Sequence, residues 1–150
     1  MTSVRNRLFL AMGHFYRLLY LVPVAGDRMV RGIGGAIAFM NYRSPYGVKT
    51  FVSMDEFRKS FEGLVEMADL PVEVTGHDDE RLQLVVKRCP YGFSKPGHKG
   101  VCDAAMYMDE KMYGYCGATL VTEECIPDGF PVCKCSIYAP GKAPGGKGGA

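Results

Sequence analysis

Cysteine is missing from the first half of the chain, and long apolar runs are missing from all of it. No stretch reaches the ~18 uninterrupted apolar residues expected of a membrane-spanning helix. The formal net charge of +2 is close to neutral, and no basic run alternates with aromatic residues. Nucleic acid is therefore not an expected partner, because the charge and the aromatic pattern of a nucleic-acid groove are both missing. The sequence has no internal repeat.

The composition is otherwise that of a folded protein. Of the 150 residues, 47% are hydrophobic, which suits one domain with a modest core. The N-terminus partly imitates a signal peptide, with Arg5 and Arg7 before an apolar stretch, but His14 and Arg17 interrupt that stretch. We therefore expect a cytoplasmic protein, in which clustered thiols are more often metal ligands or redox groups than structural disulfides.

Residues 1–50 are predicted to form an N-terminal helical segment. Within residues 4–22, apolar side chains recur at spacings of three and four, which predicts an amphipathic helix that ends at Pro23. These side chains are Leu8, Met12, Phe15, Leu19 and Val22. The apolar face is expected to pack on the core or on a second copy of the chain. The alternative is peripheral contact with a membrane surface, which the arginines and aromatics of this helix support.

A second helix is predicted from an N-cap at Asp27 to Met40. Its small residues, from Gly32 to Ala38, favour close approach of another helix. Together with the apolar first helix they make a homodimer the expected assembly. The Gly-Ile-Gly-Gly sequence here matches neither a dinucleotide fingerprint nor a P-loop. Residues 41–50 are predicted to form a loop.

Residues 51–138 are predicted to form an α+β domain. Ser53 to Glu56 is a capping box that starts a helix, and Pro71 closes that helix. One helix is predicted to cross the sheet at residues 102–113. Strands are predicted at residues 71–75, 81–88, 118–124 and 132–138. The expected fold is thus α+β, with N-terminal helices followed by a small antiparallel sheet, one crossing helix and a cysteine metal site. Residues 139–150 contain only Gly, Pro, Ala and Lys and are predicted to be disordered.

Most of the cysteines fall at the edge of a predicted element or in a turn, where their side chains can point to a common centre. They are Cys89, Cys102, Cys116, Cys125, Cys133 and Cys135. Four thiolates in a tetrahedral arrangement favour zinc or an iron–sulfur cluster. No Cys-x2-Cys pair is present, which argues against a zinc ribbon or a bacterial ferredoxin.

Two of these cysteines and one histidine have other interpretations. Cys135 shares a strand face with Cys133 but lies one pleat deeper, and we interpret it as a small core residue. Cys116 stands between two glycines and stays open as a ligand, a reactive thiol or a packed side chain. Among the histidines, only His98 lies in a loop between two cysteines and is a candidate for contact with the site.

Several short motifs occur between about residue 64 and residue 138. They are Arg88-Cys89-Pro90-Tyr91, then Val101-Cys102-Asp103, then Glu124-Cys125 followed by Gly129 and Cys133-x-Cys135. Together they resemble the V4R (4-vinyl reductase) domain family. The thiazoline-carboxylate hydrolase-like family has a similar cysteine pattern. The V4R resemblance implies a helical N-terminal part followed by an α+β unit. Members of that family include ligand-sensing domains of phenol-responsive regulators and proteins linked to bacteriochlorophyll synthesis.

The resemblance also implies zinc bound by Cys102, Cys125 and Cys133. In some members an acidic residue three positions before the third motif cysteine completes the site, and here that position holds Thr122. Cys89 is the natural replacement for the missing ligand. Weaker candidates are Glu123, Glu124 and Cys116.

Three functions fit this sequence. The first is a four-cysteine, metal-stabilised domain that binds a small apolar or aromatic molecule in a sensing or accessory role. A closed thiolate site of this kind leaves no open position for catalysis. The second is an iron–sulfur protein with a [4Fe-4S] cluster, serving electron transfer or assisting an oxidoreductase, with apolar shielding from Ile126, Phe130 and Val132.

The third function is a small-molecule hydrolase or reductase. Its available groups form no pair at a diagnostic spacing. They are Cys116, His98, Asp103, Asp109 and Glu110. Asp109, Glu110 and Lys111 are interpreted as a solvated helix face. The sequence leaves open whether the protein is an enzyme and places zinc slightly ahead of iron–sulfur.

Overall fold

The computed structural model describes residues 4–44 and 50–144. The helices in these ranges are α1 (Val4–Tyr20), α2 (Gly26–Arg43), α3 (Met54–Ala68) and α4 (Lys99–Gly114). The strands are β1 (Val72–His77), β2 (Arg81–Val86), β3 (Thr119–Glu124) and β4 (Cys133–Tyr138). Two short 3-10 helices, η1 (Pro96–His98) and η2 (Ile126–Asp128), precede α4 and β4. The α+β class is confirmed, with all predicted helices and strands present in the predicted order.

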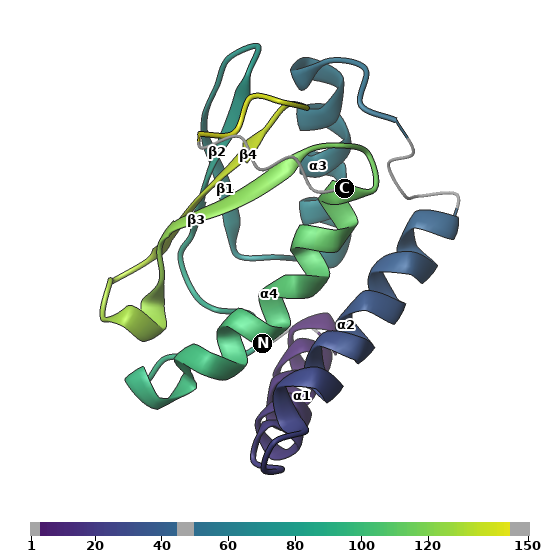
Figure 1. Ribbon diagram of the computed structural model, residues 1–150. Coiled ribbons are helices and arrows are strands. Elements are labelled where there is room, and N and C mark those ends of the chain that lie inside the picture. Colours follow the sequence, from purple (N-terminus) through teal and green to yellow (C-terminus); the bar gives the residue numbers. More distant parts are fainter. Residues whose placement is uncertain (1–3, 45–49, 145–150) are drawn as a thin grey trace.

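The four strands form one antiparallel sheet in the order β1-β2-β4-β3. The alternation predicted for β2 is confirmed, because Leu82 and Leu84 are buried while Gln83 between them is only half-buried. Phe57 and Phe61 of α3 pack against these leucines in one core. The buried face of the sheet therefore points toward α3 and α4, as Figure 1 shows.

Helix α4 lies between the sheet and α2, so the fold has three layers (Figure 1). The close packing of α2 on α4 depends on glycine at position 34, because a Cβ there would lie only 3.1 Å from the Met108 Cβ. Val30 and Ala38 of α2 are fully buried. The predicted close approach of another helix to this small-residue face is confirmed, and that helix belongs to the same chain.

The start of α2 corrects one prediction. Ala25, not Asp27, occupies the N-cap position, and it makes no side-chain capping bond. Asp27 lies inside the first turn and accepts a hydrogen bond at 2.9 Å from the Arg31 Nε. An acidic residue is favoured there by the helix dipole and by an i,i+4 ion pair, which accounts for its position. The helix continues through Arg43 into the predicted loop 41–50, whose residues 45–49 lie outside the described ranges.

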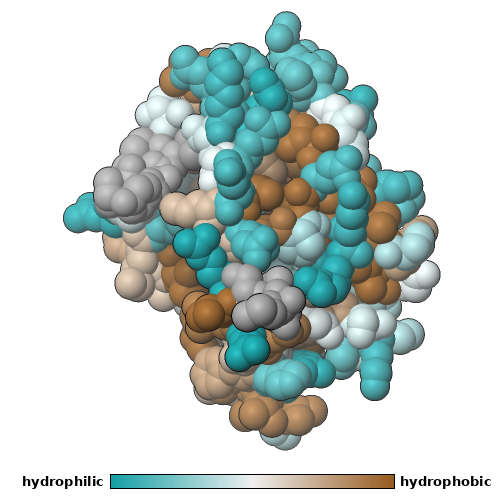
Figure 2. Space-filling view, turned by 180° about the vertical axis from the view of Figure 1, so that it is seen from behind, coloured by the Kyte–Doolittle hydropathy of each residue, from teal (hydrophilic) through white to brown (hydrophobic). Residues whose placement is uncertain are grey.

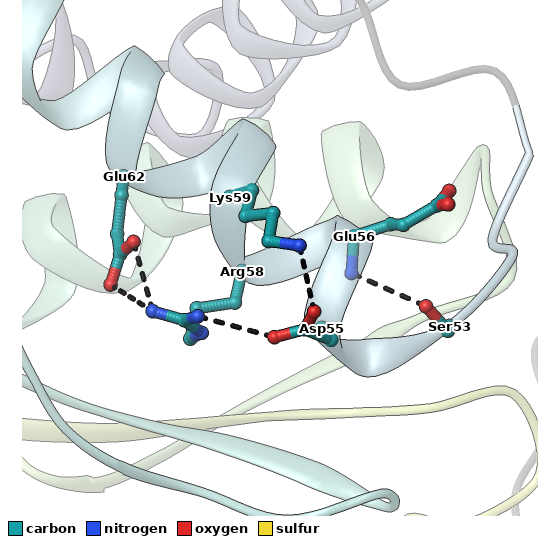
Figure 3. A network of polar contacts seen from close by, with 6 residues as sticks. All are labelled: Ser53, Asp55, Glu56, Arg58, Lys59 and Glu62. Atoms are coloured by element: carbon teal, nitrogen blue, oxygen red, sulfur yellow. Dashed lines mark hydrogen bonds and ion pairs between the residues drawn. The ribbon is translucent and has the colours of Figure 1, made fainter.

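The start of α3 confirms another prediction. The Glu56 backbone N–H donates a hydrogen bond to the Ser53 Oγ at 3.2 Å. Figure 3 shows this cap beside an ion-pair network in which Arg58 joins Asp55 and Glu62. An N-cap of this kind stabilises a helix by about 1 kcal/mol. The helix is therefore anchored at its first turn by residues that are local in sequence.

Helix α1 begins where predicted but ends at Tyr20, two residues before the predicted end, and it buries a different face. Tyr16 is 1% exposed, whereas Leu8 and Phe15 of the predicted apolar stripe are 69% and 49% exposed. Figure 2 shows apolar side chains gathered at the end of the molecule where α1 and the turn to α2 lie. Among the described residues, no helix is both long and apolar enough to cross a membrane. Ala139, the first residue of the predicted tail, is buried, and residues 145–150 lie outside the described ranges.

Candidate metal centre

The ends of four elements meet at one end of the sheet, and each end carries a cysteine. Cys89 follows β2, Cys102 lies in the first turn of α4, Cys125 follows β3, and Cys133 begins β4. The antiparallel register pairs Val86 with Cys133, which sets the end of β2 beside the start of β4. All four cysteines line the same cavity. The side chains predicted as ligands, far apart in sequence, thus line one cavity.

Two contacts define the centre of this group. The Cys102 and Cys125 sulfurs lie 3.6 Å apart, and the Ile126 backbone N–H donates a hydrogen bond to the Cys133 sulfur at 3.3 Å. In a tetrahedral site with zinc–sulfur bonds of about 2.3 Å, neighbouring sulfurs lie about 3.8 Å apart. The first pair therefore already has the spacing that zinc requires. Across residues 4–44 and 50–144, however, no group of three or more His, Cys, Asp or Glu is arranged as a metal site.

Cys89 lies in a tight turn whose backbone N–H groups surround its sulfur. Gly92 has a positive φ of 74° and donates its N–H to the Cys89 carbonyl at 3.0 Å, closing a turn. Burial raises the pKa of the Cys89 thiol, while the N–H groups of Tyr91, Gly92 and Phe93 stabilise the thiolate and partly oppose that rise. Backbone donors around a sulfur are the environment of a metal-bound thiolate.

Burial and mutual repulsion make the metal-free thiols weak acids. Burial raises the pKa of Cys102 far above the usual thiol value, and neighbouring Cys125 raises it further. The pKa of Cys125 is raised to about 11 by burial and by Cys133, against a lowering effect of Lys99. A bound divalent cation would lower these thiol pKa values, because its positive charge offsets both the burial of the thiolates and their mutual repulsion. The donor types and the environment of these residues therefore fit a soft metal ion.

The remaining cysteines belong to the core between the sheet and α3. Cys116 is buried there, and its thiol donates a hydrogen bond to the Tyr113 carbonyl at 3.1 Å. Cys135 is 6% exposed in the same core, which confirms its interpretation as a core residue. It also reaches the cavity wall, whereas Cys116 is not among the described residues that line it.

His98 takes part in a local turn. Its Nδ1 accepts a hydrogen bond from the Ser94 backbone N–H at 3.2 Å, and its ring packs edge-on against Phe93. It is not among the described residues of the cavity wall. The contact considered for His98 from its position between two cysteines is therefore not observed.

The cavity has a volume of about 630 Å³ and lies between the sheet and α4. One face of α4 lines it, with Cys102, Met106, Asp109 and Tyr113 at spacings of four, three and four. Ligand sites of roughly 300–1,000 Å³ are typical for small molecules. The cysteine group therefore lies at one end of a cavity that is large enough for a small organic ligand.

Asp109 corrects the interpretation of residues 109–111 as a solvated face. Glu110 and Lys111 are exposed as predicted, but Asp109 is half-buried and faces the cavity. Burial raises the pKa of its carboxyl to about 7, and the charge of Glu110 adds to the rise. The i, i+4, i+7, i+11 spacing from Cys102 to Tyr113 would have revealed this position, because it places an aspartate within a buried stripe.

The other groups considered for catalysis do not meet. Asp103 pairs with Lys99 at 2.5 Å, and His98 and Cys116 bond to nearby backbone groups. Glu110 lines the cavity but is largely exposed to solvent. Within the described part of the chain, no hydrogen bond joins any two of the five candidate groups. The structure thus provides no nucleophile–base pair of the kind that covalent catalysis uses.

No family model matches the chain, and no curated protein matches its sequence. The V4R resemblance stays a prediction that rests on the motifs around the cysteines.

Proposed function

We propose that this chain is a V4R-like domain in which Cys89, Cys102, Cys125 and Cys133 hold a structural zinc ion beside a cavity for a small apolar or aromatic molecule. The observation that supports this most is that four separate elements bring their cysteines to the wall of one cavity. Four thiolates around zinc leave no open coordination position, so the ion would contribute folding energy and not catalysis. The protein would then act as a sensing or accessory module.

A [4Fe-4S] cluster on the same four thiolates is the alternative, with electron transfer or assistance to an oxidoreductase as the function. Such clusters are tuned by how well apolar groups exclude water. Phe130, expected to shield a cluster, is 42% exposed, and Ile126 is only half-buried. These exposures favour zinc over the cluster.

Metal analysis of native protein tests the proposal. Protein purified without oxygen is expected to be colourless and to contain one zinc ion per chain, measured by elemental analysis beside a visible spectrum. Cys102→Ser and Cys125→Ser are expected to lose most of the zinc, because their sulfurs form the closest pair. Cys116→Ser is the matched control and should retain zinc, since Cys116 lies in the other core.

Three outcomes would count against this assignment. A brown sample containing iron would show that the cysteines hold an iron–sulfur cluster and not zinc. Native protein without bound metal would end the metal proposal altogether. Full zinc content in folded Cys102→Ser would show that the ligands are different residues.

The small-molecule role is supported by the size of the cavity and by its mainly apolar wall. A hydrolase or reductase has less support, since the candidate catalytic groups are separated from one another. Because thiolate ligands must stay reduced, we expect the protein to act in the cytoplasm.

The proposed assembly is a homodimer through α1. The support is an exposed stripe of Leu8, Phe15 and Leu18 along one face of α1, followed by exposed Val22 in the turn after the helix. A stripe of this kind on a small domain is commonly covered by a second copy. Peripheral contact of the same stripe with a membrane surface is the alternative.

A further inference from the structure

The wall of the cavity carries an excess of negative charge, although the chain as a whole has a formal charge of +2. Among the described residues that line it, the cations are Arg31 and Lys99. The acidic side chains are Asp103, Asp109, Glu110, Glu123, Glu124 and Asp128. Arg31 binds Asp27 at 2.9 Å, outside the cavity wall. Asp103 and Asp128 share Lys99, and Glu124 pairs with Lys134 at 2.9 Å. Among the described residues, this leaves Asp109, Glu110 and Glu123 as the acids of the wall without an ion pair. A positively charged ligand would therefore be attracted to this cavity.

Asp109 is the acidic group in the middle of the cavity-facing side of α4, and it has no partner. No hydrogen bond or ion pair reaches its carboxyl from the described residues, while Arg31, the lining cation on α2, is held by Asp27. A half-buried carboxyl without a donor is unfavourable and is rare outside binding sites. The surroundings of Asp109 thus lack a positively charged group that would balance the charge of its carboxylate.

Tyrosine hydroxyls around Asp109 lack partners as well. Tyr91 lines the cavity, is 7% exposed, and makes no hydrogen bond with the described residues. The fully buried Tyr16 hydroxyl also has no hydrogen-bond partner in the described part of the chain. Tyr91 and Tyr16 both lie close enough to Asp109 for its charge to raise their pKa values, after the larger effect of burial. Several polar groups in one region therefore remain without partners.

We propose that the cavity binds a small aromatic amine, with the ammonium group against the Asp109 carboxylate and the ring among Tyr91, Phe93 and Tyr113. An ammonium group supplies the hydrogen-bond donors and the positive charge that Asp109 lacks, and the Tyr91 hydroxyl can accept a further hydrogen bond. The aromatic rings stack on the ligand and interact with its charge. This inference rests on the small-molecule part of the proposed function and specifies the class of ligand.

The test uses three probes of one shape on the native, metal-containing protein: benzylamine, benzyl alcohol and benzoate. Binding is measured by ligand-observed NMR and calorimetry. Benzylamine is expected to bind most tightly and benzoate least. Asp109→Asn should weaken benzylamine by about tenfold to a hundredfold, the range for a hydrogen bond to a charged group. Benzyl alcohol should change by no more than about twofold, because it brings no charge to Asp109.

Two further variants separate recognition from damage to the fold. Tyr91→Phe keeps the ring and removes only the hydroxyl, so it should weaken benzylamine less than Asp109→Asn does. Asp79→Asn makes the same chemical change at an exposed turn residue outside the cavity and should leave all three affinities unchanged.

The pH dependence gives an independent readout. The titratable groups around Asp109 are Glu110 and Tyr113 on α4, Tyr16 on α1, Tyr91 in the β2–α4 segment and Cys135 on β4. The alkylammonium stays charged from pH 6 to pH 8, while a carboxyl with a pKa of about 7 becomes mostly ionised over that range. Benzylamine affinity should therefore rise by about tenfold in the native protein and stay level in Asp109→Asn.

The outcomes separate this inference from the function on which it rests. If benzyl alcohol binds as tightly as benzylamine, or if Asp109→Asn leaves benzylamine affinity unchanged, the amine proposal is wrong while a cavity for small molecules stands. If no probe binds at millimolar concentration to protein that retains its metal, both the amine and the small-molecule role are overturned.

Discussion

Asp109 illustrates how one side chain can set the pH dependence of stability. Its folded-state pKa of about 7 lies above the ordinary aspartate value of 3.8, because burial disfavours the ionised form. The unfolded chain ionises freely above pH 4, and the folded protein therefore loses stability as the pH rises from about 4 to about 7. Above the folded pKa this loss is complete and stays constant.

The predicted result is that Asp109→Asn stabilises the protein, and more so at pH 8 than at pH 5. Asparagine never ionises, so it removes a penalty that is larger at the higher pH. Thermal unfolding of both proteins at the two pH values measures the difference. Asp79→Asn should show no such trend because Asp79 is exposed. A stabilisation that is equal at both pH values would contradict the assignment of Asp109 as a buried acid.

The thiols make a second prediction at this scale. Burial raises the pKa values of Cys89, Cys102 and Cys125, so these residues are protonated in metal-free protein near neutral pH. Zinc binding should therefore release about three protons per chain from these residues, and zinc affinity should fall as the pH is lowered. Calorimetry in two buffers of different ionisation enthalpy counts the protons.

The matched comparison for this experiment is Cys116→Ser, which should leave the number of released protons unchanged. Release of fewer than about two protons at pH 7 would mean that thiolates are not the main ligands.

At the scale of elements, the contact between α1 and the Cys89 loop depends on Gly13. A Cβ at that position would overlap the carbonyl group of Tyr91, which belongs to the loop backbone and cannot rotate away. Gly13→Ala is therefore expected to push α1 from the loop, to destabilise the protein by about 1–3 kcal/mol and to lower its zinc content. Chemical denaturation and elemental analysis provide the two measurements.

Gly32→Ala in α2 is the control for this substitution. A Cβ there meets nothing within 4 Å, so the change should stabilise the protein by about 0.5–1 kcal/mol through the higher helix propensity of alanine. If Gly13→Ala behaved like Gly32→Ala, the close packing of α1 on the loop would be wrong.

At the scale of the whole molecule, the exposed face of α1 predicts association. Leu18 is 67% exposed on the same stripe as Leu8, and Figure 2 shows apolar side chains gathered in this region. Light scattering coupled to size-exclusion chromatography should give the mass of a dimer. Leu18→Glu should give a monomer, because it places a charge within the proposed interface.

Val52→Glu is the control, since Val52 is 71% exposed but lies outside α1. A native monomer at micromolar concentration would argue against the dimer. Binding of that monomer to anionic vesicles, lost in Leu18→Glu, would instead support peripheral membrane contact.

Much of this protein could be predicted from local patterns. The capping box at Ser53, the alternation through Leu82 and Leu84, and the spacing along α1 each depend on residues that are close in sequence, so the sequence predicts those elements. The positions of the cysteines at the ends of predicted elements are also a local signal, whereas the choice of Cys89, Cys102, Cys125 and Cys133 as ligands rests on the V4R resemblance.

The tertiary structure decided which side of each element is covered. Periodicity shows which side chains share a face but not what packs on that face, so it could not show that Leu8 points outward or that Asp109 points into a cavity. It also could not separate Cys116 from the cavity wall, since that depends on how α3 and α4 pack on the sheet. Burial, charge and access at the site are consequences of contacts between residues that are distant in sequence.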